Sequence, residues 1–256
     1  MKLGAQFYSI RDKATTPEDT RLCFKEMKRI GYEVVQISGI CAIKAEQLKA
    51  YSEEFELPIT LTHSSYDRIV NDTDALINEH KLYGCSVIGL GSMPVAYRKT
   101  EEDLYKFINE IKEPIKKIKA AGLKFAYHNH DFEFKTCYGD KRVIDILAEE
   151  CPDMDFTLDV AWVEIGGANI VEYITKFAKQ KRITNLHLKD YPKLVEDRPY
   201  PFCPCGEGIV DFATIVPLAK SLGIPYCQVE QDNAPTTGDS FGQMETSYNN
   251  LKKYFN

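Results

Sequence analysis

The sequence lacks the excess of positive charge and the long apolar runs that mark two common functional classes. Lys and Arg number 32 against 38 Asp and Glu, and the formal net charge is −6. Because affinity for nucleic acid comes largely from Lys and Arg on phosphates, this balance argues against a nucleic-acid surface. A small anionic ligand held by one or two local cations remains open. The chain has no apolar run of membrane-spanning length and begins without a charged leader or cleavage site, so we expect a cytoplasmic protein without a membrane partner.

A cysteine framework is also missing. The eight cysteines are scattered, and most lie in apolar contexts where Cys is a small buried hydrophobe. Cys203 and Cys205 form a C-x-C pair, but no second pair lies nearby in the sequence. A zinc site at this pair is therefore the weaker interpretation.

What the chain has is a regular alternation of strand and helix patterns. The predicted strands are 3–9, 34–38, 58–63, 87–90, 125–130, 156–160, 183–189 and 226–230. The predicted helices are 17–30, 48–55, 74–83, 101–121, 143–150, 170–177, 212–222 and 242–254. In four places a glycine stands between a helix and an apolar strand: Gly31, Gly84, Gly122 and Gly223. Glycine there predicts a left-handed helix cap followed at once by the next strand.

Short connections and strands too apolar for a half-exposed sheet predict a parallel sheet covered by helices. Eight such units in a chain of 256 residues match the size of a closed (β/α)8 barrel. We therefore predict an α/β fold in which residues 1–256 form a single TIM barrel domain. The alternative, a doubly wound open sheet, should carry a glycine-rich dinucleotide fingerprint after the first strand, and YSIRDK has none.

The stretch 125–134, FAYHNHDFEF, changes abruptly from an apolar run to histidines and carboxylates. Alternation along a strand places His128 and His130 on one face. Burying such groups costs roughly 2–7 kcal/mol each unless they are paired or bind something. A surface strand with solvated histidines is the alternative, but polar residues also close other strands: Gln6, Gln36, His63, Asp159, His187, Lys189 and Glu230. Because barrel sites lie at the carboxyl ends of the strands, we expect one active site there.

Carboxylates and imidazoles on several walls of one barrel are most simply explained by a divalent metal ion. Its charge removes the repulsion between Asp159 and Glu230 and favours neutral imidazole.

These residues carry a resemblance to the sugar phosphate isomerase/epimerase superfamily, the xylose isomerase-like TIM barrels. It covers essentially the whole chain and is strongest in FTLDVAW, the HLKD strand, the GEGIVDF turn and QVEQD. In that family one divalent cation is usually held by Glu, Asp, His and Glu at the ends of strands five to eight. The resemblance therefore implies a Mn, Mg, Zn or Co ion bound by Asp159, His187 and Glu230, with His128 at the position of the first Glu.

The resemblance implies an enzyme acting on a small sugar, keto sugar or polyol through an enediolate-type proton transfer. With His128 in place of one carboxylate, Glu230 is the obvious base, so an isomerase, dehydratase or lyase is favoured over a two-base epimerase. Glu133 is the candidate second acid or base, with a solvated loop carboxylate as the alternative.

Five further residues are assigned to substrate binding: Gln6, His63, His130, Trp162 and Lys189. The alternatives are a core or capping role for His63, a core position for Trp162 and a structural ion pair for Lys189. The GEGIVDF turn is interpreted as structural, with Asp211 as a helix cap.

Two other functions remain as hypotheses. One is a sugar-binding or regulatory barrel without turnover, which the His128 substitution favours. The other is an endonuclease IV-like repair enzyme, which would need a histidine where this chain has Trp162. Substrate identity is expected to depend on loop 191–205, and a homo-oligomer is possible.

Overall fold

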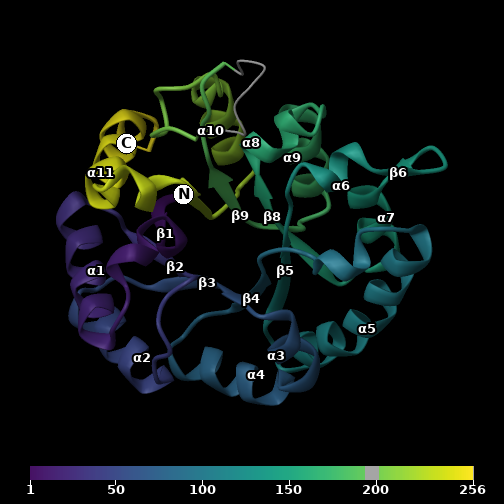
Figure 1. Cartoon of the computed structure of the whole chain (residues 1–256), viewed down its shortest axis with the longest axis horizontal. Coiled ribbons are helices and arrows are strands. Elements are labelled where there is room, and N and C mark those ends of the chain that lie inside the picture. The colour runs from purple at the N-terminus through teal and green to yellow at the C-terminus, as the bar shows by residue number, and fades with distance from the viewer. Residues whose placement is uncertain (194–201, 256) are drawn as a thin grey trace.

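A computed structural model describes residues 1–193 and 202–255 of the chain. Within these residues, eight parallel strands close into a barrel in the order β1, β10, β9, β8, β5, β4, β3 and β2 (Figure 1). They are β1 (Lys2–Gln6), β2 (Val34–Ile37), β3 (Ile59–Ser64), β4 (Val87–Leu90), β5 (Lys124–His128), β8 (Met154–Asp159), β9 (Ile183–Leu188) and β10 (Tyr226–Val229). The TIM barrel prediction is confirmed.

The longer helices form a ring around the barrel (Figure 1). They are α1 (Pro17–Ile30), α2 (Ala45–Glu54), α4 (Thr73–Leu82), α5 (Glu101–Ala120), α7 (Val143–Glu150), α9 (Ile170–Lys179), α10 (Phe212–Ser221) and α11 (Ser240–Leu251). Thr16 and Thr100 cap α1 and α5 by accepting from the backbone N–H three residues on. The four glycines predicted to end helices all have φ between 73° and 117°, as a left-handed cap requires.

The structure corrects several predicted boundaries. The strand predicted at 125–130 ends at His128, and the last helix begins at Ser240 rather than at position 242. The first strand ends at Gln6 rather than at position 9, because the Gln6 side chain accepts from Tyr8 N and starts the 3-10 helix η1 (Phe7–Lys13). Helix α2 begins at Ala45 rather than at position 48.

The sequence analysis also missed several short elements. They are α3 (Tyr66–Asn71), α6 (Phe132–Lys135), α8 (Val160–Ile165), β6 (Cys137–Tyr138), β7 (Lys141–Arg142), η2 (Val95–Tyr97) and η3 (Ala234–Thr237). The 3-10 helix η4 (Lys252–Tyr254) lies inside the predicted helix 242–254. Segments of two to six residues are too short to show a hydrophobic period.

Strand alternation separates an apolar outer face from a polar barrel interior. Outward side chains such as Phe125, Tyr127 and Leu186 pack into the main core beneath the helices. Inside the barrel, Leu61, Val87 and Ala126 form a small separate apolar cluster. Above it the interior is polar, so the barrel offers buried hydrogen-bonding groups at the ends of its strands. In the part of the chain that the structure describes, every helix is too short or too polar to cross a membrane.

Candidate metal centre and active site

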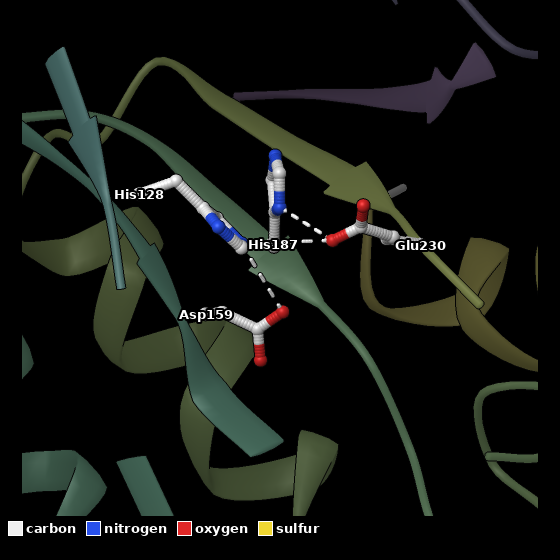
Figure 2. A group of neighbouring side chains, drawn as sticks. All are labelled: His128, Asp159, His187 and Glu230. Atoms are coloured by element: carbon white, nitrogen blue, oxygen red, sulfur yellow. Dashed lines mark hydrogen bonds and ion pairs between the residues drawn. The ribbon is translucent and has the colours of Figure 1, made fainter. Parts of the chain in front are cut away.

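Four of the predicted site residues converge at the carboxyl ends of neighbouring strands. His128 ends β5, Asp159 ends β8, His187 lies in β9, and Glu230 follows β10. All four side chains are buried, and one potential ligand atom of each lies within 4.8 Å of the others. Figure 2 shows the four side chains pointing toward one another. The barrel thus gathers two imidazoles and two carboxylates around a common point.

Each imidazole uses one nitrogen to contact an oxygen outside the group and turns the other inward. His187 Nε2 lies 2.6 Å from Gln36 Oε1, and its Nδ1 lies 2.8 Å from Glu230 Oε2. His128 Nδ1 lies 2.9 Å from the carbonyl oxygen of Gly91, and its Nε2 lies 3.5 Å from Asp159 Oδ2. When the outer nitrogens donate to these oxygens, the inward nitrogens present lone pairs, the arrangement that second-shell acceptors impose on metal-binding histidines.

Lys189 brings a positive charge to the same group. Its Nζ lies 3.0 Å from Asp159 Oδ2, 3.1 Å from Glu230 Oε2 and 3.1 Å from Asp232 Oδ2. Burial alone would raise the pKa of Glu230 and of Asp159, but the Lys189 ammonium and the neighbouring histidines together hold the pKa of both carboxylates below its usual value. Both carboxylates are therefore ionised at neutral pH.

The donor set fits a divalent cation. Three carboxylates surround one ammonium here, so the group retains unbalanced negative charge. Within residues 1–193 and 202–255, His128 Nε2 has no hydrogen-bond partner, although it is buried and faces carboxylate oxygens of Asp159 and Glu230. Burial alone would lower the pKa of His128, but the carboxylates of Asp159 and Glu230 that face it raise this pKa. The surroundings thus favour a positive charge at this nitrogen, and mixed imidazole and carboxylate ligands suit Zn, Mn or Co.

A cleft of about 760 Å³ opens directly above this group. Glu230, Asp232, His63, His128 and His130 line it, together with hydroxyl side chains: Tyr8, Ser38, Ser64, Ser65, Tyr66 and Ser92. The hydroxyls and imidazoles on this wall can exchange hydrogen bonds with a polar ligand.

Two of the three histidines on the cleft wall, His63 and His130, are neutral. Burial, followed by the neighbouring imidazole His128, lowers the pKa of His130 to about 2. The same two causes hold the pKa of His63 well below its usual value. Their rings lie 5.0 Å and 5.2 Å from that of His128. His63 and His130 can therefore exchange hydrogen bonds with a ligand without adding charge.

The sequence model of the xylose isomerase-like TIM barrel family matches residues 24–243. The chain belongs to the xylose isomerase-like TIM barrel family. No curated protein matches its sequence.

Solved structures share the barrel across nearly its whole length. A sugar phosphate isomerase/epimerase from Parabacteroides distasonis ATCC 8503 is 21% identical, with a TM-score of 0.78 and coverage of 99% of this chain and 98% of that one. The probable 3-DHS dehydratase AsbF from Bacillus anthracis is 13% identical, with a TM-score of 0.72 and coverage of 100% and 99%. The IOLI protein, solved with a bound zinc atom, is 14% identical, with a TM-score of 0.72 and the same coverage. At these identities the likeness shows the fold.

Glu133 does not belong to the group of four potential metal ligands. It is fully buried on α6 rather than solvated in a surface loop. Its Oε1 accepts from the Tyr127 hydroxyl and its Oε2 from the His130 backbone N–H. Burial raises the pKa of Glu133 to about 7. Because Tyr127 lies on the outer face of β5, the Glu133 carboxylate supports the loop that carries His130.

The other predicted substrate residues lie at different depths. Trp162 is 9% exposed, and its ring centroid lies 5.5 Å from that of His130 and 5.1 Å from that of Phe202. Gln6 is fully buried below the cleft, where its side chain accepts from Tyr8 N. Lys189 points into the barrel at Asp159 and Glu230. The neighbouring Asp190 side chain points instead toward the GEGIVDF turn.

Asp190 organises the GEGIVDF turn. Its carboxylate accepts from the backbone N–H groups of Tyr191, Gly206, Gly208 and Val210. A side chain at Gly208 would place Cβ only 2.2 Å from Asp190 Oδ1, which explains the glycine. Asp211 caps α10, as predicted. Of the predicted specificity loop 191–205, residues 194–201 lie outside the described part of the chain.

Two contributors to the site were not assigned a role from the sequence. Asp232 binds Lys189, and Gln36 contacts His187. Their signals were present: Gln36 ends its strand with a polar side chain, and Asp232 stands two residues beyond Glu230 in QVEQD. Their partners became evident only once the barrel closed, because Gln36 and His187 are 151 residues apart.

Proposed function

We propose that this chain is a metal-dependent isomerase, epimerase or dehydratase/lyase that acts on a small sugar, keto sugar or polyol. The observation that carries the proposal is the buried group of His128, Asp159, His187 and Glu230 at the floor of a hydroxyl-lined cleft. Proteins of the same fold include an isomerase/epimerase and a probable dehydratase, and a third, the IOLI protein, was solved with zinc. The reactions share a proton transfer beside a carbonyl or hydroxyl carbon.

His128, Asp159, His187 and Glu230 would hold the cation. When bound, a divalent ion supplies Lewis-acid polarisation of a sugar oxygen and so acidifies the adjacent carbon. The chain's own residues then bind and move protons. Glu230 is the proposed base, because its carboxylate is ionised and borders the cleft.

The cleft wall supplies orientation. His63 and His130, both neutral, are proposed to hydrogen-bond sugar hydroxyls, and Lys189 to balance negative charge that develops on substrate oxygen. Trp162 packs behind His130, and Gln6 supports Tyr8 on the cleft wall. We assign Glu133 to holding the His130 loop, with proton transfer as the alternative role.

A one-base reaction follows from this arrangement. A two-base epimerase needs a carboxylate on each side of the reacting carbon. Here Glu230 and Asp232 both border the cleft, but they follow the same strand and share Lys189, so they lie on one side of it. Glu133 is bound to Tyr127 and to the His130 backbone. An isomerase, dehydratase or lyase is therefore favoured over a two-base epimerase.

A sugar-binding barrel without turnover is the second candidate. The observation that favours it is the Lys189 ammonium, which already neutralises part of the charge of Asp159 and Glu230. The main proposal also includes a single domain over residues 1–256, a cytoplasmic location and assembly into a homo-oligomer. Its partner is a sugar rather than nucleic acid or a membrane. The acidic net charge of −6 supports the exclusion of nucleic acid.

The experiment is a deuterium-exchange screen. The purified protein, stripped of metal and reloaded with Mn²⁺, Zn²⁺, Co²⁺ or Mg²⁺, is incubated in deuterated water with a panel of keto sugars and polyols. We expect metal-dependent incorporation of deuterium at a carbon next to a carbonyl for at least one compound. Stoichiometric metal without exchange on any compound would favour the binding protein, and absence of metal binding would contradict both the centre and the reaction.

A further inference from the structure

The position of Lys189 has a consequence for metal binding. Its side chain is 1% exposed, and its Nζ contacts Asp159 Oδ2 at 3.0 Å and Glu230 Oε2 at 3.1 Å. The same two oxygens face His128 Nε2 and belong to the group that could hold a metal. The ammonium and a divalent ion therefore draw on the same negative charges.

The remaining walls around the Lys189 ammonium also suit a cation. Asp232 Oδ2 lies 3.1 Å from Nζ, and the rings of Trp162 and Phe202 lie 5.3 Å and 5.0 Å from it. Aromatic faces within about 6 Å attract a cation through their quadrupole. Asp232 differs from the other two carboxylates because its side chain is 30% exposed, whereas those of Asp159 and Glu230 are 0% and 4% exposed. It is the partner closest to solvent and to a ligand in the cleft.

We propose that Lys189 is a built-in competitor of the metal: the ammonium and the divalent ion are alternative partners of Asp159 and Glu230. When the ion binds, the Lys189 ammonium loses its contacts with Asp159 and Glu230 and keeps its contact with Asp232 at the wall of the cleft. There the ammonium meets an anionic oxygen of the substrate. This inference rests on the proposed metal-dependent function and deepens it, because it makes metal affinity and the placement of Lys189 one equilibrium.

The physical reason is repulsion between two cations in a buried site. Like charges a few ångströms apart repel each other strongly in a buried site, because the effective dielectric constant there is well below that of water. The ion therefore has to displace the ammonium, which lowers its apparent affinity. Asp232 reduces that cost because it retains the displaced lysine.

The direct test is the metal affinity of K189M, measured by calorimetric titration with Mn²⁺ and Zn²⁺. Methionine keeps an unbranched stem without the charge. We expect K189M to bind at least about tenfold more tightly than wild type, the lower end of the coupling between close buried charges. K25M, which removes an exposed lysine on α1, controls for net charge and should bind as wild type does.

A double-mutant cycle separates competition from simple attraction. D232N should weaken metal binding, but loss of a nearby negative charge alone would do so as well. If Asp232 acts by retaining the displaced lysine, D232N should have little effect in the K189M background. An effect of equal size in both backgrounds would overturn the transfer of Lys189 to Asp232.

Wild-type crystals with and without Mn²⁺ give a readout that does not depend on the folding of any variant. The proposal predicts that, with the ion bound, Lys189 Nζ stays on Asp232 and leaves hydrogen-bond distance of Asp159 and Glu230. If neither wild type nor any of the variants binds metal, the metal centre is overturned together with this inference. Metal binding of wild-type affinity in K189M, or an unmoved Lys189 beside the bound ion, would overturn this inference and leave the proposed function standing.

Discussion

Replacing Glu230 by Gln removes the proposed base while keeping the shape of the side chain. In the structure Glu230 Oε2 lies 2.8 Å from His187 Nδ1 and 3.1 Å from Lys189 Nζ, so the carboxylate is held ionised at the edge of the cleft. A neutral amide cannot accept a proton from carbon at neutral pH. A positioned general base contributes typically about 10²–10⁴-fold to the rate, equivalent to about 3–5 kcal/mol in the barrier. We expect exchange to fall by that factor or more.

The assay is NMR detection of deuterium at the carbon next to the carbonyl, with a substrate found by the exchange screen. Each sample is checked for metal content and thermal melting, because Gln is also a weaker ligand than Glu. The rate is then expressed per metal-loaded site. Undiminished exchange in metal-loaded E230Q would refute the assignment of Glu230 as base and make Glu133 the next candidate.

Three further predictions concern the surroundings of this base. H130A should raise the KM for the sugar and leave metal content unchanged, since His130 lines the cleft outside the ligand group; loss of metal in H130A would contradict that separation. Burial raises the pKa of Glu133 to about 7 in the folded chain, so the folded state retains a proton that the unfolded chain releases near pH 4.3. The free energy of unfolding should therefore fall as pH rises from about 4.3 to 7, by at most about 3–4 kcal/mol. In urea unfolding, E133Q should lose this pH dependence. An unchanged slope in E133Q would mean that another group titrates. Stripping the metal should lower the free energy of unfolding by about 2.7 kcal/mol relative to protein with free ion at 100 times Kd, and an unshifted melting curve would argue against a folded-state site.

The barrel was predictable because its signals are local and repeated. A glycine after a helix, an apolar strand and a polar residue at the strand end recur along the chain, and each needs only a few neighbouring residues to be recognised. The predicted caps Thr16, Thr100 and Asp211 were confirmed for the same reason. Short segments such as α6 and α8 were not found, because four to six residues carry no helical period.

The candidate site was predictable residue by residue but not contact by contact. His128, Asp159, His187 and Glu230 could be collected as strand ends, since a closed barrel brings these ends together. Lys189 was different, because the sequence allowed two roles for it, substrate binding or a structural ion pair. Its actual partners, Asp159, Glu230 and Asp232, come from two other positions around the barrel, and no local pattern connects them. For Glu133 the alternative of a solvated loop carboxylate was wrong, because the side chain is buried on α6 and binds Tyr127.

The most direct test of the metal centre is anomalous diffraction from crystals grown with Mn²⁺ or Zn²⁺. The account predicts one strong anomalous peak, bound by His128, Asp159, His187 and Glu230 at about 2.0–2.6 Å, the range for N and O ligands of these ions. A peak found only at Cys203 and Cys205, or no peak at the barrel centre in metal-saturated crystals, would contradict it.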